Sequence, residues 1–84
     1  MIPSKLFAVS PHFTAEQKEQ FKEPFQIVND SFRPEIGSII THKKLSRDMT
    51  WIVSDSRYAY NGNLVDCIIT VTGLKTTGEI NEPL

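Results

Sequence analysis

The sequence predicts an α+β fold in which a kinked, amphipathic N-terminal helix packs on a small antiparallel sheet or a partly open barrel. Three observations predict it: a helix-capping pattern at Thr14, apolar residues at helical spacing after it, and the dipeptide Asn61-Gly62 between two long runs of strand-forming residues. The 84 residues suffice for one small domain. We expect residues 1–36 to form its helical part and residues 37–84 its antiparallel β part.

A short strand or extended arm is expected first, over Lys5 to Ser10, followed by a helix that begins near Thr14. The strand prediction rests on four consecutive apolar residues that start at Leu6. The helix prediction rests on Thr14-Ala15-Glu16-Gln17, which fits a capping box. In this box the Thr14 hydroxyl accepts from the Gln17 amide, and the Gln17 side chain reaches back to the start of the helix.

The predicted helix is amphipathic and kinked. Apolar side chains recur at spacings of four, three and four residues, which places them on one stripe facing a core. They are Phe21, Phe25, Val28 and Phe32. Pro24 interrupts this pattern, because its ring lacks an N–H and collides with the carbonyl four residues earlier, at a cost of about 3 kcal/mol in a straight helix. We therefore expect a kink at Glu23, or two short helices with Pro24 in the first turn of the second.

The rest of the chain is predicted to be β. A strand follows Gly37 as far as His42, a charged turn spans residues 43–48, and a long strand starts at Met49. We also expect a short final strand over residues 77–80.

The long strand is predicted to turn back at Asn61-Gly62. A type I′ turn needs positive φ at both central residues, which asparagine tolerates and glycine accepts freely. Because the turn sets the register, Arg57 is expected opposite Asp66, an opposite-charge pair worth roughly 0.2 to 1 kcal/mol.

In this register the sheet has apolar side chains on both faces, although a small sheet that packs on a single core needs them on only one. In one interpretation, the second surface is covered because the sheet closes into a barrel or because the N-terminal segment packs on it. In the other, it is exposed and docks a protein partner. Four apolar residues would then make the contact, and three residues at the hairpin tip would orient it. The predicted protein-binding residues are Trp51, Val53, Leu64 and Ile68, with Arg57, Tyr58 and Tyr60 at the tip.

Composition narrows the classes of function. A net charge of −1 gives no general attraction to nucleic acid or to anionic membranes. A single cysteine, Cys67, excludes an intrachain disulfide, and no apolar leader follows Met1. No apolar run approaches the roughly 20 residues that span a bilayer. We therefore expect a soluble, cytoplasmic protein that does not act at a membrane.

No motif for catalysis, metal binding or a cofactor occurs in the sequence. His12 and His42 are the two imidazoles and Cys67 is the one thiol, and they follow no catalytic or zinc-binding spacing. The hairpin register points Cys67 to an apolar face, so we expect this cysteine to be buried and inert. A non-enzymatic protein without metal or cofactor is predicted.

The alternative to protein binding is nucleic-acid binding through the basic loop 42–47. Lys43, Lys44 and Arg47 could contact phosphates while the hairpin aromatics stack on bases. Such loops are usually solvated turns, and acidic neighbours such as Asp48 weaken the positive potential. Protein binding is therefore the first prediction and nucleic-acid binding the second.

Part of the chain resembles a known group of proteins. Gly37-Ser38-Ile39-Ile40, then Met49 to Val53, the strand with Cys67 and a closing Glu79-Ile80-Asn81-Glu82 resemble the strand order of short, uncharacterised bacterial SH3-like barrel proteins. The resemblance covers residues 37–84, and the N-terminal third departs from it. It implies an SH3-like barrel that serves as a protein- or nucleic-acid-binding module rather than an enzyme. We accordingly expect a small accessory or inhibitory protein of bacterial or phage origin, whose partner and oligomeric state the sequence leaves open.

Overall fold

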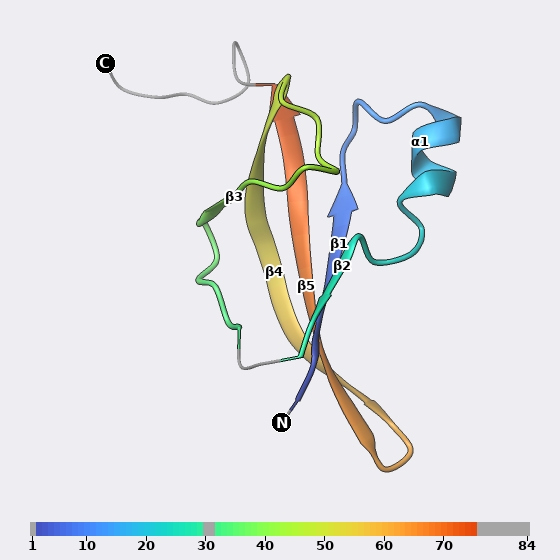
Figure 1. Ribbon diagram of the computed structural model, residues 1–84, viewed down its shortest axis with the longest axis vertical. Coiled ribbons are helices and arrows are strands. Elements are labelled where there is room, and N and C mark those ends of the chain that lie inside the picture. The colour runs from blue at the N-terminus through green and yellow to red at the C-terminus, as the bar shows by residue number, and fades with distance from the viewer. Residues whose placement is uncertain (1, 30–31, 76–84) are drawn as a thin grey trace.

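The computed structural model describes residues 2–29 and 32–75 (Figure 1). Five strands and one short helix lie within them: β1 (Ser4–Val9), α1 (Ala15–Gln20), β2 (Gln26–Val28), β3 (Ile39–Ile40), β4 (Met49–Asn61) and β5 (Leu64–Lys75). The final strand predicted at residues 77–80 and the closing segment of the resemblance, Glu79 to Glu82, lie outside the described residues.

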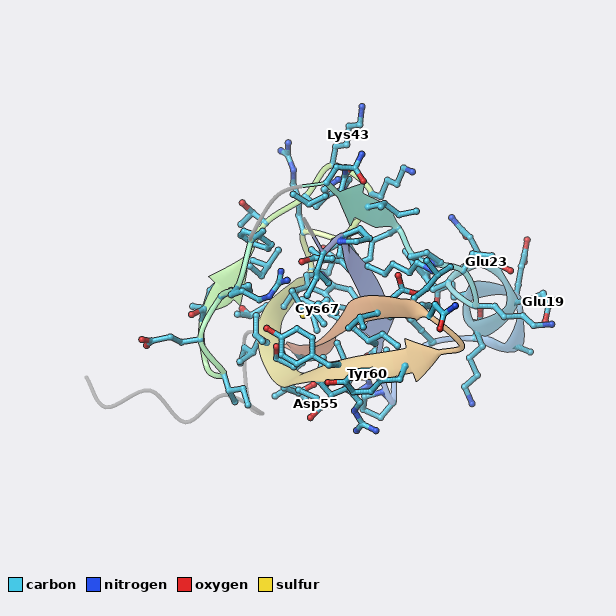
Figure 2. The ribbon with its side chains drawn as sticks, turned by 90° about the horizontal axis from the view of Figure 1, so that it is seen from below. Glu19, Glu23, Lys43, Asp55, Tyr60 and Cys67 are labelled. Carbon is cyan, nitrogen blue, oxygen red and sulfur yellow. The ribbon has the colours of Figure 1, made fainter. Side chains whose placement is uncertain are left out.

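The five strands form one curled, mixed sheet with the order β2-β1-β5-β4-β3. β1 runs parallel to β5, and the other neighbouring strands are antiparallel. Figure 2, which looks along the strands, shows the sheet curling into a half-barrel. The predicted α+β class is therefore wrong. The part of the chain expected to be helical supplies β1 to the middle of the sheet and β2 to one edge, and the described residues are mostly β.

The helix begins where the capping box predicts and ends much earlier than the apolar pattern predicts. The Gln17 N–H donates to the Thr14 hydroxyl at 3.1 Å, and the Thr14 N–H donates to the Gln17 side-chain oxygen at 2.9 Å. α1 stops at Gln20 and buries none of its residues. Pro24 lacks an N–H and disfavours a helical residue before it, so the chain leaves the helix and continues as extended β2. The kinked helix packed on the sheet is therefore absent from the described residues.

The four apolar residues of the predicted stripe nevertheless all contact the core. Phe25 is 5% exposed and belongs to it, and Phe21, Val28 and Phe32 pack against it half-buried. They reach the core from a strand and from irregular segments on either side of it. Their spacing therefore predicted correctly that these side chains contact the core, but it predicted a helix where the chain forms a strand and irregular segments.

The β4–β5 hairpin is present, but it turns at Gly62-Asn63, one residue later than predicted. Asn61 pairs with Leu64 across the turn. Gly62 has a φ of 65°, and among the described residues only glycines have positive φ. A two-residue loop in which only the first residue, a glycine, has positive φ is typical of a type II′ turn. A type I′ turn needs positive φ at both loop residues. The predicted type I′ turn at Asn61-Gly62 is therefore wrong.

A β-bulge in β4 decides which side chains face the core. Val53 pairs with Val71 and Asp55 with Thr70, so Ser54 is an extra residue between them. In a regular strand Val53 and Asp55 would share a face, because side chains alternate with a period of two. The extra residue instead puts Val53 on the inner face and Asp55 on the outer face.

The inner face of the sheet is covered by side chains from the loops. Phe13 and Phe21 stack with their ring centroids 5.1 Å apart, and Leu45 of the basic loop is 5% exposed. The core residues are Leu6, Ala8, Phe13, Phe25, Leu45, Trp51, Val53, Cys67, Ile69 and Val71. Cys67 is fully buried inside the curl (Figure 2), which confirms the predicted burial of its thiol.

Trp51 lies flat against the backbone of its cross-strand partner, Gly73. Its indole N–H donates to the Ser46 carbonyl at 2.9 Å, and the Phe13 ring centroid lies 5.7 Å from its own. A Cβ atom on Gly73 would come within 2.6 Å of the Trp51 ring. Only glycine therefore leaves room for the indole at this pair.

We predict that Gly73→Ala lowers the free energy of unfolding by about 1–3 kcal/mol, because the new methyl group overpacks the site. Urea denaturation monitored by Trp51 fluorescence measures the loss. In a Trp51→Leu background, followed by circular dichroism, the same substitution should cost much less, because the ring that it meets is gone. An equal cost in both backgrounds would show that the indole is not the reason.

Candidate functional site

The bulge divides the predicted protein-binding surface between the core and the outside. Trp51 and Val53 are 3% and 0% exposed, so both belong to the core and present no surface to a partner. Ile68 is half-buried on the outer face of the sheet, and Leu64 is 70% exposed beside the turn. The apolar surface predicted from these four residues does not form.

The predicted pair of Arg57 and Asp66 does not form either. Arg57 lies opposite Ile68, and its Nε donates to the Asp55 carboxylate of the same strand at 2.6 Å. Asp66 instead forms an ion pair with Lys5 of β1 at 3.1 Å. These differences follow from the later turn, which shifts the cross-strand partner of each β4 residue near the tip by two positions along β5.

The exposed hydrophobic residues of the hairpin gather at its tip. Tyr58 and Tyr60 lie two residues apart on one face of β4 and are 52% and 78% exposed, and Leu64 begins β5. β1 pairs with β5 only from Cys67 onward, so the tip has no neighbouring strand among the described residues. The hairpin therefore extends beyond the rest of the sheet, as Figure 1 shows.

Arg33 holds Tyr58 against the N-terminal strand. Its guanidinium carbon lies 5.6 Å from the centroid of the Tyr58 ring, and its Nε donates to the Tyr58 hydroxyl at 3.4 Å. The same guanidinium donates to the Ser4 hydroxyl, to the Phe32 carbonyl at 2.8 Å and to the Ile2 carbonyl at 3.4 Å. One face of the hairpin tip is thus fixed by an arginine that the sequence analysis did not single out.

The basic loop lies at the other end of β4 from the hairpin tip. Lys43, Lys44 and Arg47 are exposed, and the Lys44 ammonium donates to the Phe25 carbonyl at 3.3 Å. Lys43 and Arg47 line an open pocket of about 660 Å³ together with Trp51 and residues of β3. The loop ends just before β4 begins, and the tyrosines lie where β4 ends, so the structure does not bring the basic residues and the hairpin aromatics together (Figure 1).

The candidate catalytic groups are occupied in structural contacts. His42 shares a hydrogen bond of 3.1 Å with the Gln26 side chain and packs edge-on against the Phe25 ring. The buried Cys67 sulfur lies 4.0 Å from the hydroxyl of Ser56, a residue that is itself exposed. Among residues 2–29 and 32–75, no group of three or more His, Cys, Asp or Glu side chains is arranged to hold a metal ion.

Comparisons with protein-family models, with curated proteins and with solved structures find no significant match for this chain. In the part of the chain that the structure describes, no helix has both the length and the hydrophobicity needed to span a bilayer.

We predict that Cys67 reacts with a thiol reagent in the native state at least about a hundredfold more slowly than in the urea-unfolded chain, because access to it requires opening of the core. Ser56→Cys, in a Cys67→Ala background, provides an exposed thiol on the neighbouring strand as a control, and it should react quickly. Rapid reaction of Cys67 in the native protein would reopen a role for it as a nucleophile.

Proposed function

We propose that this protein is a small, non-enzymatic protein-binding module that contacts its partner through the hairpin tip. The observation that supports this proposal is the exposure of Tyr58, Tyr60 and Leu64 at the projecting end of the hairpin. Tyrosine is enriched among the residues that contribute most to binding at protein interfaces. Arg57 lies on the opposite face of β4 from the two tyrosines and pairs with Asp55.

The tip is also suited to binding because part of it is already ordered. A tyrosine side chain has only two rotatable angles, so fixing it on binding costs little conformational entropy. The Arg33 contacts with the ring and hydroxyl of Tyr58 lower that cost further before any partner arrives. Tyr60 and Leu64 then remain as side chains that a partner can bury.

Nucleic-acid binding is the second candidate, and the exposed cations Lys43 and Arg47 support it. The separation of this loop from the hairpin aromatics argues against one site that combines phosphate contacts with base stacking. Any such binding would depend on the loop alone, in a chain with a net charge of −1.

Site-specific photo-crosslinking in a lysate of the source organism distinguishes the two candidates. A photoreactive phenylalanine analogue at position 60 should form discrete protein adducts that survive nuclease treatment. Tyr58→Ala combined with Leu64→Ala should lower their yield at least about tenfold, the effect of losing about 1.4 kcal/mol of binding free energy.

The matched control is Lys43→Glu combined with Lys44→Glu, which should leave the adducts at position 60 unchanged. Urea denaturation checks that the variants fold. The tip substitutions should change the free energy of unfolding of the protein by only about 0.5 kcal/mol, because the replaced side chains are exposed. Adducts that form only from position 43 and disappear with nuclease would overturn the proposal in favour of nucleic-acid binding.

A further inference from the structure

The backbone of the basic loop is fixed by its own hydrogen bonds and by the core. The Lys44 N–H donates to His42 Nδ1 at 3.1 Å, and the Leu45 N–H donates to the His42 carbonyl at 3.0 Å. The Leu45 side chain is buried, and the Ser46 carbonyl accepts from the Trp51 indole N–H at 2.9 Å. Because the loop is ordered in advance, binding of a ligand by its side chains costs little backbone entropy.

Two cations of this loop have no ion-pair partner among the described residues. They are Lys43, which extends outward from the curled sheet (Figure 2), and Arg47. Lys44 differs from them, because its ammonium donates to the Phe25 carbonyl at 3.3 Å. Three cations elsewhere in the described chain pair with carboxylates: Lys5, Lys22 and Arg57. The charges of Lys43 and Arg47 are therefore available to an anion.

Both of these cations line one open pocket. It lies between β3, the basic loop and the start of β4, at the end of the sheet opposite the hairpin tip (Figure 1). Its volume of about 660 Å³ is within the range of roughly 300–1,000 Å³ that is usual for sites of small ligands. Ile39, Ile40 and Met49 supply apolar surface, and Ile39 is 62% exposed. No aspartate or glutamate of the described residues lines the pocket, which therefore offers apolar surface beside two positive charges.

A doubly charged head group would use both cations of the pocket. A phosphate monoester carries a charge of about −1.5 to −2 at pH 7 and three acceptor oxygens, so an arginine fork and a lysine ammonium can both contact it. A carboxylate carries a single charge and suits the arginine alone. An apolar group attached to the phosphate would cover Ile39 and Met49. The pocket therefore suits a phosphate ester with an apolar body better than a carboxylate or inorganic phosphate.

We propose that this pocket binds a small organic phosphate monoester. The phosphate lies between Lys43 and Arg47, and the apolar body of the ligand covers Ile39 and Met49. The site is separate from the hairpin tip and does not depend on protein binding there, because the two lie at opposite ends of β4 (Figure 1). It also differs from a nucleic-acid site, which follows the phosphates along a strand, because the pocket holds one terminal phosphate group.

The probe is phenyl phosphate, and the readout is the NMR spectrum of the isotope-labelled full chain. Titration should shift the amide signals of β3 and the basic loop saturably, with a dissociation constant of about 1 mM or lower. Inorganic phosphate lacks the apolar body and benzoate lacks the second charge, so each should bind at least about tenfold more weakly. The proposal is overturned if no saturable shift occurs, or if either control binds as tightly as phenyl phosphate.

Charge removal tests the part played by the two cations. Lys43→Gln with Arg47→Gln should weaken the binding of phenyl phosphate at least about tenfold. Lys18→Gln with Lys22→Gln makes the same change in net charge away from the pocket and should alter binding less than about twofold. Both pairs replace exposed side chains, and a preserved NMR spectrum shows that each variant is folded. Unchanged binding by the first pair would contradict the proposal.

Ile39→Ser tests the apolar part of the site. It should weaken phenyl phosphate at least about threefold and leave inorganic phosphate unchanged, because only the phenyl ring covers Ile39. Ile27→Ser is the matched control and should change neither, because Ile27 is an exposed isoleucine of the other edge strand and does not line the pocket. An oligonucleotide without a terminal phosphate that shifts the same signals and binds more tightly than phenyl phosphate would overturn the proposal in favour of nucleic-acid binding.

Discussion

The extra residue at Ser54 is the constraint on which the described sheet depends. It allows one strand to direct Trp51 and Val53 inward at one end and to carry Asp55 and Arg57 on the outer face further along. Without it, the indole and the valine would face outward and the core would lose two of its buried side chains. Bulges also increase local twist and bend the strand, which agrees with the curl of the sheet.

Proline has the second decisive effect, because Pro24 acts on two elements at once. It limits α1 to one short segment after its capping box, and it stops the pairing of β2 with β1. The first effect turns an expected helix into strand and loop. The second ends the β1–β2 ladder at Leu6. A single ring without an N–H thus explains both the failure of the α+β prediction and the short ladder between β1 and β2.

The sequence predicted local features well and long-range ones poorly. The capping box at Thr14, the presence of a hairpin and the burial of Cys67 depend on neighbouring residues or on simple alternation, and all three are confirmed. The parallel pairing of β1 with β5 joins residues more than sixty positions apart, and no local pattern encodes it. The bulge left only an ambiguous signal, because Ser54-Asp55-Ser56 fits either a polar stretch of a regular strand or a bulge, and a shift of one residue moves a side chain to the other face. Arg33 was missed because its contacts also come from distant segments.

An open strand edge usually favours aggregation, and proteins commonly protect such edges with lysine or proline. Both occur near the part of β1 beyond Leu6, as Lys18, Lys22 and Pro24, and Ala8 in that part is only 2% exposed. The positive charge of the two lysines also repels a second basic strand. Proline, charge and burial together therefore protect this edge of β1 from pairing with another chain.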